Sequence, residues 1–310
     1  MHSKIAIIGC GNVGGATAFA AAMKGKYDLV LLDAPDREGI ARAKALDIQQ
    51  ASAAQQIDIK VIGTSQWSAI EGCTLCIITA GLPRSPGMTR DDLLSMNTHI
   101  MRNISREIKT FAPSSKIVVV SNPLDAMAQQ VFIHTGFEPE RVMGMAGLLD
   151  TSRLRHLVAS AAGCSVKAVS GLVLGAHGDA MVPVLSQCFV DGIPIESVLT
   201  SSQIRRIIHR TRNGGGEIVA LMGRSAYFAA AQCVLKMVES IFERSDERIS
   251  ASVYVNGQYG IQDLFLGMPV RLGTSGVEEI FELDLTEKER NWLLKSASMV
   301  KEMTQKASLL

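Results

Sequence analysis

The sequence contains little that would place it outside the ordinary globular proteins. Its six cysteines among 310 residues are far too few for a disulfide-built scaffold. The 31 Lys and Arg residues nearly balance the 30 Asp and Glu residues, and this formal charge of +1 argues against an extended basic face for nucleic acid. A hydrophobic content of 47% excludes a disordered chain. Since domains average about 150 residues, one or two globular domains remain.

Long uncharged runs are also scarce. The longest begins after Lys4 and ends at Met23, where a secretory signal peptide would place an apolar helix. Four glycines and Asn12 interrupt this run, and no other approaches the roughly 20 apolar residues of a membrane helix. We therefore expect a cytoplasmic protein that binds neither a membrane nor nucleic acid.

Cys73 and Cys76 form the one cysteine pair with a suggestive spacing. No second Cys or His pair follows at the spacing of a zinc site, and the surrounding segment resembles a buried strand. We expect reduced, buried thiols and no metal site.

The first half of the chain, residues 1–145, alternates short apolar runs with segments of helical spacing. This alternation is typical of βαβ units and predicts an α/β fold with a doubly wound parallel sheet of the Rossmann type. The predicted strands are Lys4–Ile8, Asp28–Asp33, Ile57–Ile62, Leu75–Ala80 and Lys116–Ser121, and the helices extend from the first strand to about Lys24, over Ala41–Gln49 and over Asp91–Phe111.

The pattern changes near residue 147 and predicts a C-terminal α+β substrate domain at residues 146–310. Asp191-Gly192 between two short apolar segments indicates a hairpin. No polar linker separates the halves, so we expect them to pack tightly together. The other predicted strands are Val169–Leu174, Ala251–Val255, Leu264–Leu272 and Glu278–Leu283, and the helices are Ile204–Arg212, Ala226–Phe242 and Thr286–Lys306.

A glycine-rich turn follows the first predicted strand. Residues 9–14 read G-C-G-N-V-G and open a helix, and Asp33 ends the next strand. In a dinucleotide site, Gly9 permits the tight turn, Gly11 the approach of the pyrophosphate and Gly14 the helix–strand contact. An Asp at position 33 accepts hydrogen bonds from ribose hydroxyls and repels a 2′-phosphate, which favours NAD over NADP. An FAD site, or a turn that only packs a helix on a sheet, would show the same glycines.

Polar residues follow the later strands of the first half. Arg84 and Arg90 lie on a loop rich in Pro and Gly, and Asn122 follows the fifth predicted strand. Doubly wound folds bind ligands at this edge of the sheet. Taken singly, the arginines could be a solvated loop edge, and Asn122 could be a turn residue before proline. We expect the next helix to begin at Asp91 or Asp92.

Three further candidates lie in the second half. Asp150 and Arg153 share one face of a predicted helix, and His177 stands in a G-A-H-G-D segment. Histidine is the usual proton carrier near neutral pH, and a carboxylate partner orients it. Taken singly, these residues could be a helix N-cap, a surface arginine and a structural histidine. The sequence does not show whether Asp150 and His177 meet.

Five motifs occur in a fixed order along the chain. They are Gly9-x-Gly11-x-x-Gly14 with Asp33, Ala80-Gly81-Leu82-Pro83-Arg84-x-Pro86-Gly87-Met88-x-Arg90, Asn122-Pro123-Leu124-Asp125, Asp150-x-x-Arg153 and Gly175-x-His177-Gly178-Asp179. In this order they resemble the lactate/malate dehydrogenase family over essentially the whole chain, and the loop resembles that of the lactate-dehydrogenase-like malate dehydrogenases. The resemblance implies NAD-dependent interconversion of (S)-malate and oxaloacetate, as in the tricarboxylic acid cycle, by a homodimer or homotetramer.

The resemblance also implies a role for each candidate residue. His177 exchanges the proton of the substrate hydroxyl, and Asp150 orients its ring. Arg153 binds the C1 carboxylate, and Arg90 polarises the carbonyl from a mobile loop, residues 82–91. The residues that would contact NAD are Gly9, Cys10, Gly11, Asn12, Val13, Gly14, Asp33, Asn97, Val120, Ser121 and Asn122.

The choice of substrate depends on a few positions of the resemblance. Arg84 stands where lactate-specific relatives have Gln, and it would pair with the C4 carboxylate, while Asn122 positions the reacting oxygen. Ala226 stands where lactate enzymes commonly carry Thr. Two residues depart from the family pattern. Ser85 replaces a basic residue, and Cys10, more often Ala, could make NAD binding sensitive to oxidation.

Three alternatives remain open. An L-lactate dehydrogenase is the nearest one. The NAD-using phospho-glycosidases share the opening motif, but they are longer and use a metal with Cys and His ligands. A non-catalytic NAD-binding protein would be expected to lose His177, Asp150 or Arg153. The apolar faces of residues 16–22 and 226–242 could form either a subunit contact or part of the core.

Overall fold

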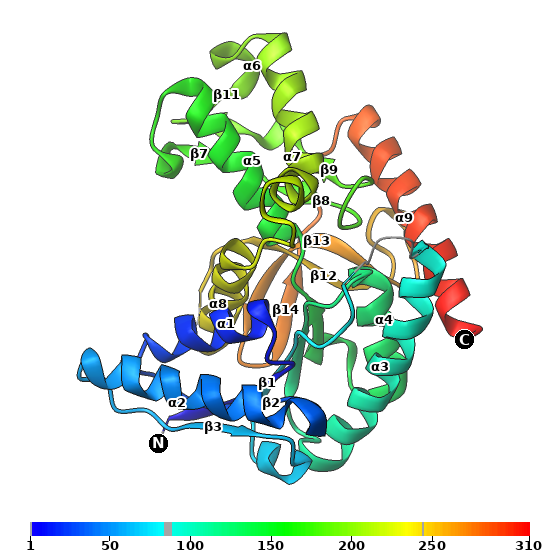
Figure 1. The fold of residues 1–310 in the computed structure, drawn as a ribbon. Helices are drawn as coiled ribbons and strands as arrows, with labels where there is room; N and C mark the ends of the chain where they lie inside the picture. The colour runs from blue at the N-terminus through cyan, green and yellow to red at the C-terminus, as the bar shows by residue number, and fades with distance from the viewer. Residues whose placement is uncertain (1, 84–88, 244) are drawn as a thin grey trace.

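The computed structural model describes residues 2–83, 89–243 and 245–310. Arg84 and Ser85 lie outside these residues, as does the side chain of Arg90. Nine strands of the described chain form one sheet, in the order β14-β13-β12-β6-β5-β4-β1-β2-β3. Helices cover both faces of this sheet, and a smaller lobe of helices and short strands stands beyond its end (Figure 1).

The first six strands are parallel, and their order is that of a Rossmann fold. Alternate residues of β1 point to opposite faces, so Ile5 and Ile7 belong to one buried cluster while Ala6 and Ile8 belong to another. The predicted doubly wound sheet is therefore confirmed. Its elements are β1 (Ser3–Ile8), α1 (Asn12–Ala22), β2 (Tyr27–Leu32), α2 (Glu38–Ala54), β3 (Val61–Thr64), β4 (Leu75–Ile78), α3 (Arg90–Phe111), β5 (Lys116–Val119), α4 (Leu124–Thr135) and β6 (Val142–Gly144).

Some predicted boundaries in this half are wrong. β3 begins only at Val61, because residues 57–60 form a connection in which Lys60 bonds to the Asp28 side chain. The sequence pattern also misses α4 and β6. α4 is buried on nearly every side and so lacks an amphipathic period, and β6 has only three residues.

The second half extends the same sheet. Its three long strands are antiparallel, and Ser252 pairs with Gly144 of β6, so the sheet continues without interruption from one half to the other. The elements are α5 (Gly147–Ala162), β7 (Val169–Ser170), β8 (Val173–Leu174), β9 (Val182–Pro183), β10 (Phe189–Val190), β11 (Ile193–Pro194), α6 (Ile195–Val198), α7 (Ser201–Met222), α8 (Phe228–Phe242), β12 (Ile249–Val255), β13 (Leu264–Gly273), β14 (Gly276–Ile280) and α9 (Glu287–Ser308). Short 3₁₀ helices lie at Pro35–Arg37, Trp67–Ile70, Pro139–Arg141, Val166–Ala168, Leu185–Gln187 and Gln258–Gly260.

The predicted hairpin is present, and both turn residues have the positive φ that a two-residue type I′ loop requires (Asp191 48°, Gly192 78°). The single strand predicted at 169–174 is wrong, because β7 pairs with β10 while β8 pairs with β9. The predicted strand at 278–283 lies at 276–280 instead. α7 does not end at Arg212 but continues to Met222.

Each of the two apolar segments that could have been either core or subunit contact packs one face into the core, while Phe19 and Phe228 remain exposed. α1 packs directly against α8, and Ala18, Ala21, Val234 and Val238 belong to one buried cluster. Residues 16–22 of the first half and 226–242 of the second therefore join the two halves.

Candidate active site

The glycine-rich turn lies between β1 and α1. Gly9 has φ +100°, and a Cβ on Gly14 would lie 2.0 Å from the Gly9 carbonyl oxygen, so this contact admits only glycine. A Cβ on Gly11 would meet nothing within 4 Å, which leaves that side of the turn open. No side chain caps the N-terminus of α1 at Asn12, so its first N–H groups are available to an anion. This geometry fits the pyrophosphate of a dinucleotide.

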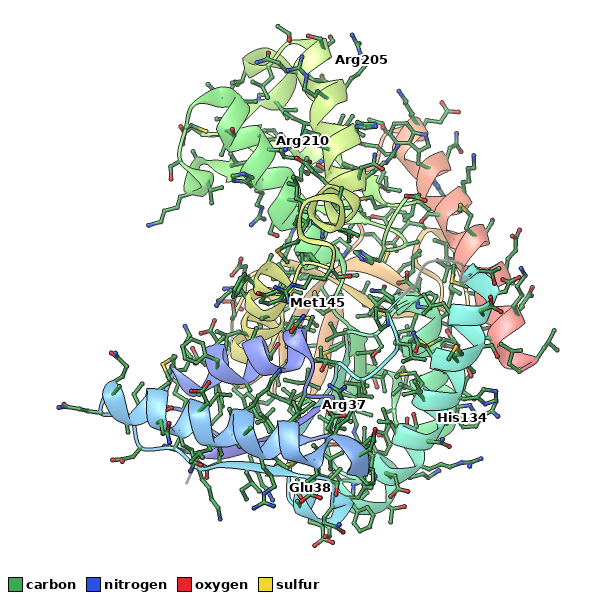
Figure 2. All side chains as sticks on the ribbon, in the orientation of Figure 1. Arg37, Glu38, His134, Met145, Arg205 and Arg210 are labelled. Carbon is green, nitrogen blue, oxygen red and sulfur yellow. The ribbon has the colours of Figure 1, made fainter. Side chains whose placement is uncertain are left out.

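Asp33 lies at the end of β2, beside this turn. Its Oδ2 accepts hydrogen bonds from the backbone N–H of Cys10 (2.8 Å) and from Nε of Arg37 (3.2 Å; Arg37 is labelled in Figure 2). Its Oδ1 accepts from the backbone N–H of Ala34 (2.9 Å). A carboxylate has about four acceptor positions, so one remains on Oδ1 for a ribose hydroxyl.

Lys44 of α2 is a residue of this turn that the sequence analysis missed. Its Nζ donates to the carbonyl oxygens of Cys10 (2.8 Å) and Gly11 (2.7 Å). No motif marks Lys44, because it reaches the turn only through the packing of α2 beside α1. It adds a positive charge next to the open end of α1.

Cys10 is fully buried. Burial and the nearby Asp33 carboxylate raise the pKa of its thiol to about 12, so the thiolate needed for oxidation is scarce at neutral pH. The idea of an oxidation-sensitive turn is therefore not supported. Val13 and Val120 are half-buried and pack against the same core cluster.

The ends of β4 and β5 meet around the buried side chain of Asn97. Its Oδ1 accepts from the Leu82 N–H (2.8 Å), and its Nδ2 donates to the carbonyl oxygens of Asn122 (2.7 Å) and Leu82 (3.2 Å). The Ser121 hydroxyl donates to the carbonyl of Ala80. Asn97 thus connects Leu82, at the start of the arginine-bearing loop, to Asn122 through hydrogen bonds. Asn122 itself is exposed.

α3 begins at Arg90, not at Asp91 or Asp92 as predicted. Thr89 is its N-cap, and a capping box fixes this start. The Thr89 hydroxyl accepts from the Asp92 N–H, and the Asp92 carboxylate accepts from the Thr89 N–H, each at 3.0 Å.

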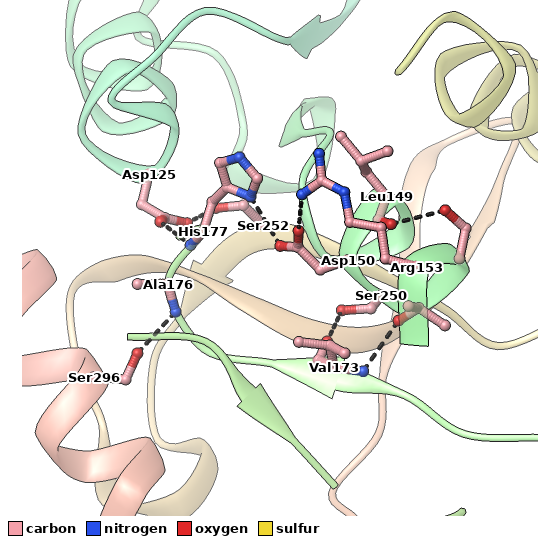
Figure 3. Close-up of polar contacts among 12 residues, drawn as sticks. Asp125, Leu149, Asp150, Arg153, Val173, Ala176, His177, Ser250, Ser252 and Ser296 are labelled. Carbon is pink, nitrogen blue, oxygen red and sulfur yellow. Dashed lines mark hydrogen bonds and ion pairs between the residues drawn. The ribbon is translucent and has the colours of Figure 1, made fainter. Parts of the chain in front are cut away.

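The second-half candidates come together around one buried carboxylate (Figure 3). Asp150 Oδ2 accepts a hydrogen bond from His177 Nδ1 at 2.8 Å, and its Oδ1 accepts from Arg153 Nη1 at 3.0 Å. Asp150 is 1% exposed and lies in the first turn of α5, which begins at Gly147, so the reading of Asp150 as an N-cap is wrong. His177 follows β8.

The electrostatics of this group favour a protonated histidine. Burial by itself lowers the pKa of His177, but the charge and the hydrogen bond of Asp150 outweigh it and hold that pKa above its usual value. Because a carboxylate only accepts, Nδ1 carries a proton, and Nε2 lies on the far side of the ring (Figure 3). Nε2 is therefore the atom available to a substrate.

The backbone around His177 is held by residues to which the sequence analysis gave no role. Buried Asp125 accepts from the His177 N–H (3.1 Å) and from the Ser252 hydroxyl (2.7 Å). Burial raises the pKa of Asp125, and these two hydrogen bonds oppose that effect. Ser296 of α9 accepts from the Ala176 N–H at 2.8 Å. Asp125 lies in a quoted motif, whereas nothing in the sequence marks the two serines.

Models of two protein domains match the chain. The NAD-binding domain of lactate/malate dehydrogenases matches residues 3–144, and the alpha/beta C-terminal domain of the same family matches residues 148–309. The chain belongs to the lactate/malate dehydrogenase family. The predicted family, NAD as cofactor and an oxidoreductase activity are thereby confirmed.

Named relatives agree with this assignment. The chain is 46% identical to a malate dehydrogenase of Oceanobacillus iheyensis, over 97% of this chain and 96% of the relative. The solved malate dehydrogenase of Salinibacter ruber superposes with a TM-score of 0.94 at 39% identity, covering 99% and 98% of the two chains. A lactate dehydrogenase of Cryptosporidium parvum, solved with lactic acid and NAD, gives 0.95 at 34% identity over 99% and 98%. Because both kinds of dehydrogenase share this fold, the fold alone does not select the substrate.

Among residues 2–83, 89–243 and 245–310, no helix is long and apolar enough to cross a membrane. No group of three or more His, Cys, Asp or Glu side chains among them is placed to hold a metal ion.

Proposed function

We propose that the protein is an NAD-dependent malate dehydrogenase that interconverts (S)-malate and oxaloacetate. The observation that carries the proposal is the buried Asp150 carboxylate, which is bonded to both His177 and Arg153. This arrangement supports His177 as the proton carrier and Arg153 as the carboxylate-binding cation, each bonded to a different oxygen of Asp150. The relatives named malate dehydrogenase support the choice of substrate.

In the direction of reduction, protonated His177 donates a proton from Nε2 to the carbonyl oxygen of oxaloacetate, and Asp150 stabilises the imidazolium before transfer. Arg153 holds the C1 carboxylate through two parallel hydrogen bonds, which its planar guanidinium allows. Asn122 orients the reacting oxygen. The reduced cofactor, NADH, would supply the hydride from C4 of its nicotinamide ring to C2 of oxaloacetate and would leave as NAD.

The proposed NAD site is formed by the turn between β1 and α1 and by residues at the ends of β2 and β5. Asp33 binds the ribose and disfavours a 2′-phosphate, and the open turn binds the pyrophosphate with Lys44 beside it. Asn97 contributes through the hydrogen bonds that fix Leu82 and Asn122. The assigned set is Gly9, Cys10, Gly11, Asn12, Val13, Gly14, Asp33, Asn97, Val120, Ser121 and Asn122.

Substrate choice is assigned to the loop at residues 82–91, which we propose closes over the site and excludes water. Arg90 would polarise the reacting carbonyl, and Arg84 would pair with the C4 carboxylate. Pyruvate lacks that carboxylate and would leave Arg84 unpaired. An unpaired, desolvated charge costs about 3–5 kcal/mol, or roughly 10² to 10³ in discrimination. Ala226 leaves space for the longer acid.

We also propose residues 1–145 as the cofactor domain and 146–310 as the substrate domain of a cytoplasmic homodimer or homotetramer that serves the tricarboxylic acid cycle. The bacterial relatives support the compartment. Phe19, Leu46 and Phe228 support self-association, because they are large apolar side chains left exposed on the neighbouring helices α1, α2 and α8.

The proposed function is tested by His177→Asn, assayed by NADH oxidation with oxaloacetate. Loss of the proton carrier should lower kcat by about 10² to 10⁴-fold, with NADH affinity, measured by fluorescence, unchanged. His156→Asn is the matched control, because His156 is an exposed histidine of α5, and it should behave as the wild type. Near-normal turnover of His177→Asn would remove the central residue of the proposal.

A further inference from the structure

Three consecutive glycines, Gly214, Gly215 and Gly216, lie in the interior of α7. Glycine is one of the least favourable residues in a helix interior, so such a run needs a reason. None of the three has a positive φ, so the backbone conformation does not require glycine. The N-terminal part of the same helix buries Ile204 and Ile207 on one face and exposes charged residues on the other, with Arg205 projecting from the end of the lobe (Figure 2).

The three positions differ in what a side chain would meet. A Cβ on Gly214 would lie 3.3 Å from Cδ and 3.5 Å from Nε of Arg153. A Cβ on Gly215 would lie 3.7 Å from Nη2 of the same arginine, and one on Gly216 would meet nothing within 4 Å. Carbon atoms pack best at about 3.5–4.0 Å, so only the first of these contacts is too close. The Arg153 stem therefore lies directly against the backbone of α7.

Arg153 is held on its other side by Asp150. Its Nη1 donates to Asp150 Oδ1 at 3.0 Å, and its side chain is only 17% exposed. α5, which carries both residues, packs along α7. The guanidinium thus has a fixed position between a buried carboxylate and a helix backbone, and it cannot retreat from an added methyl group without changing its relation to Asp150.

We propose that Gly214 is a positioning residue for the substrate carboxylate: its missing side chain lets Arg153 lie flat on α7 in the orientation that two-point carboxylate binding requires. The inference rests on the proposed function of Arg153. A bidentate arginine–carboxylate pair depends on the plane and direction of the guanidinium, so a shift of a few tenths of an ångström at Cδ moves the two donors away from the carboxylate. Gly214 therefore acts on substrate affinity and not on the proton transfer.

The experiment compares Gly214→Ala with Gly216→Ala in the full-length enzyme. Alanine favours the helix at either position, so Tm should not fall for Gly216→Ala, and its KM for oxaloacetate should match that of the wild type. Gly214→Ala should raise the KM for oxaloacetate about tenfold or more and change kcat less. NADH affinity should be unchanged in both variants. Hydroxymalonate, a dicarboxylate that NADH cannot reduce, should bind to the Gly214→Ala enzyme–NADH complex correspondingly more weakly.

A double-mutant cycle with Arg153→Lys shows whether the effect passes through Arg153. Lysine keeps Cγ and Cδ but lacks the guanidinium whose orientation Gly214 is proposed to set, so Gly214→Ala should raise KM less in that background than in the wild type. Gly215→Ala, whose Cβ makes an ordinary contact, should have an intermediate or small effect, and this graded series remains measurable even if Gly214→Ala lowers Tm. Equal KM values for all three alanine variants would overturn the proposal.

The outcomes separate this inference from the proposed function. If Arg153→Lys alone leaves KM unchanged, the assigned role of Arg153 fails. If Arg153→Lys raises KM while Gly214→Ala behaves as Gly216→Ala does, only the positioning role of Gly214 fails.

Discussion

At the scale of single residues, the site depends on one carboxylate that serves two partners. Asp150 is almost completely buried, and its two oxygens accept from His177 and Arg153 at 2.8 and 3.0 Å. The same charge that raises the pKa of His177 also restrains the guanidinium that is proposed to bind substrate. The proton transfer and the carboxylate binding that we propose thus both depend on the Asp150 side chain.

Replacing Asp150 by Asn should shift the pH dependence of both directions of the reaction. Without the carboxylate charge, the pKa of His177 falls, because that charge opposes the effect of burial. Oxaloacetate reduction needs protonated His177, so its alkaline limit should move to lower pH. Malate oxidation needs neutral His177, so its acid limit should move to lower pH too. Profiles of kcat/KM against pH measure both limits.

The control for this prediction is Asp191→Asn, which removes a charge from the exposed hairpin turn. Asp191→Asn should leave unchanged both the alkaline limit of oxaloacetate reduction and the acid limit of malate oxidation. Unchanged limits in Asp150→Asn would mean that another group sets the titration of the reaction.

Motifs predicted the chemically reactive residues better than the residues that hold them. His177, Asp150 and Arg153 are recognisable only because their two motifs occur in a fixed order with three others. The 27-residue separation of Asp150 and His177 hides their contact, which arises when the segment after β8 packs beside α5. Lys44 and Ser252 carry no signal, since lysines and serines are common and only the fold gives these two their partners.

At the scale of elements, the turn between β1 and α1 uses its glycines for different purposes. Gly14 is required by the protein itself, since a Cβ there would lie 2.0 Å from a backbone oxygen. A Cβ on Gly11 would meet no protein atom within 4 Å, so a bound ligand is the reason we assign to glycine at this position. The sequence motif shows both glycines alike, and the structure separates their roles.

Alanine substitutions at Gly14 and Gly11 should therefore have different effects, the first on thermal stability and the second on cofactor binding. Gly14→Ala should lower Tm, because a backbone clash of this kind forces α1 away from the sheet. Gly11→Ala should keep the wild-type Tm and lose NADH affinity, because its methyl group occupies the approach of the pyrophosphate. Thermal unfolding and NADH fluorescence titration of the two variants check the prediction. A Gly11→Ala enzyme that binds NADH normally would contradict the assigned place of the pyrophosphate.

Short apolar strands and amphipathic helices are predicted from the sequence, whereas other elements are missed. Five of the six parallel strands are short apolar runs, but β6 has only three residues, and α4, buried nearly all round, shows no helical period. The glycines of α7 favour an early end to that helix, yet it continues to Met222 because packing on α5 and Arg153 outweighs helix propensity.

At the scale of the whole molecule, the two halves share one sheet and meet around the site. β12 of the second half pairs with β6 of the first, and α1 packs on α8. The Ser252 hydroxyl crosses this junction to Asp125, which in turn holds the backbone of His177. Sequence periodicity predicts most of the later strands, but it carries no information about which sheet a strand joins.

The central claim, that this protein is a malate dehydrogenase, is tested most directly by the ratio of kcat/KM for oxaloacetate to kcat/KM for pyruvate, both with NADH. The proposed pairing of Arg84 with the C4 carboxylate predicts a ratio of at least about 10², and Arg84→Gln should narrow or invert this preference. Equal values for the two substrates in the wild-type enzyme would contradict the claim.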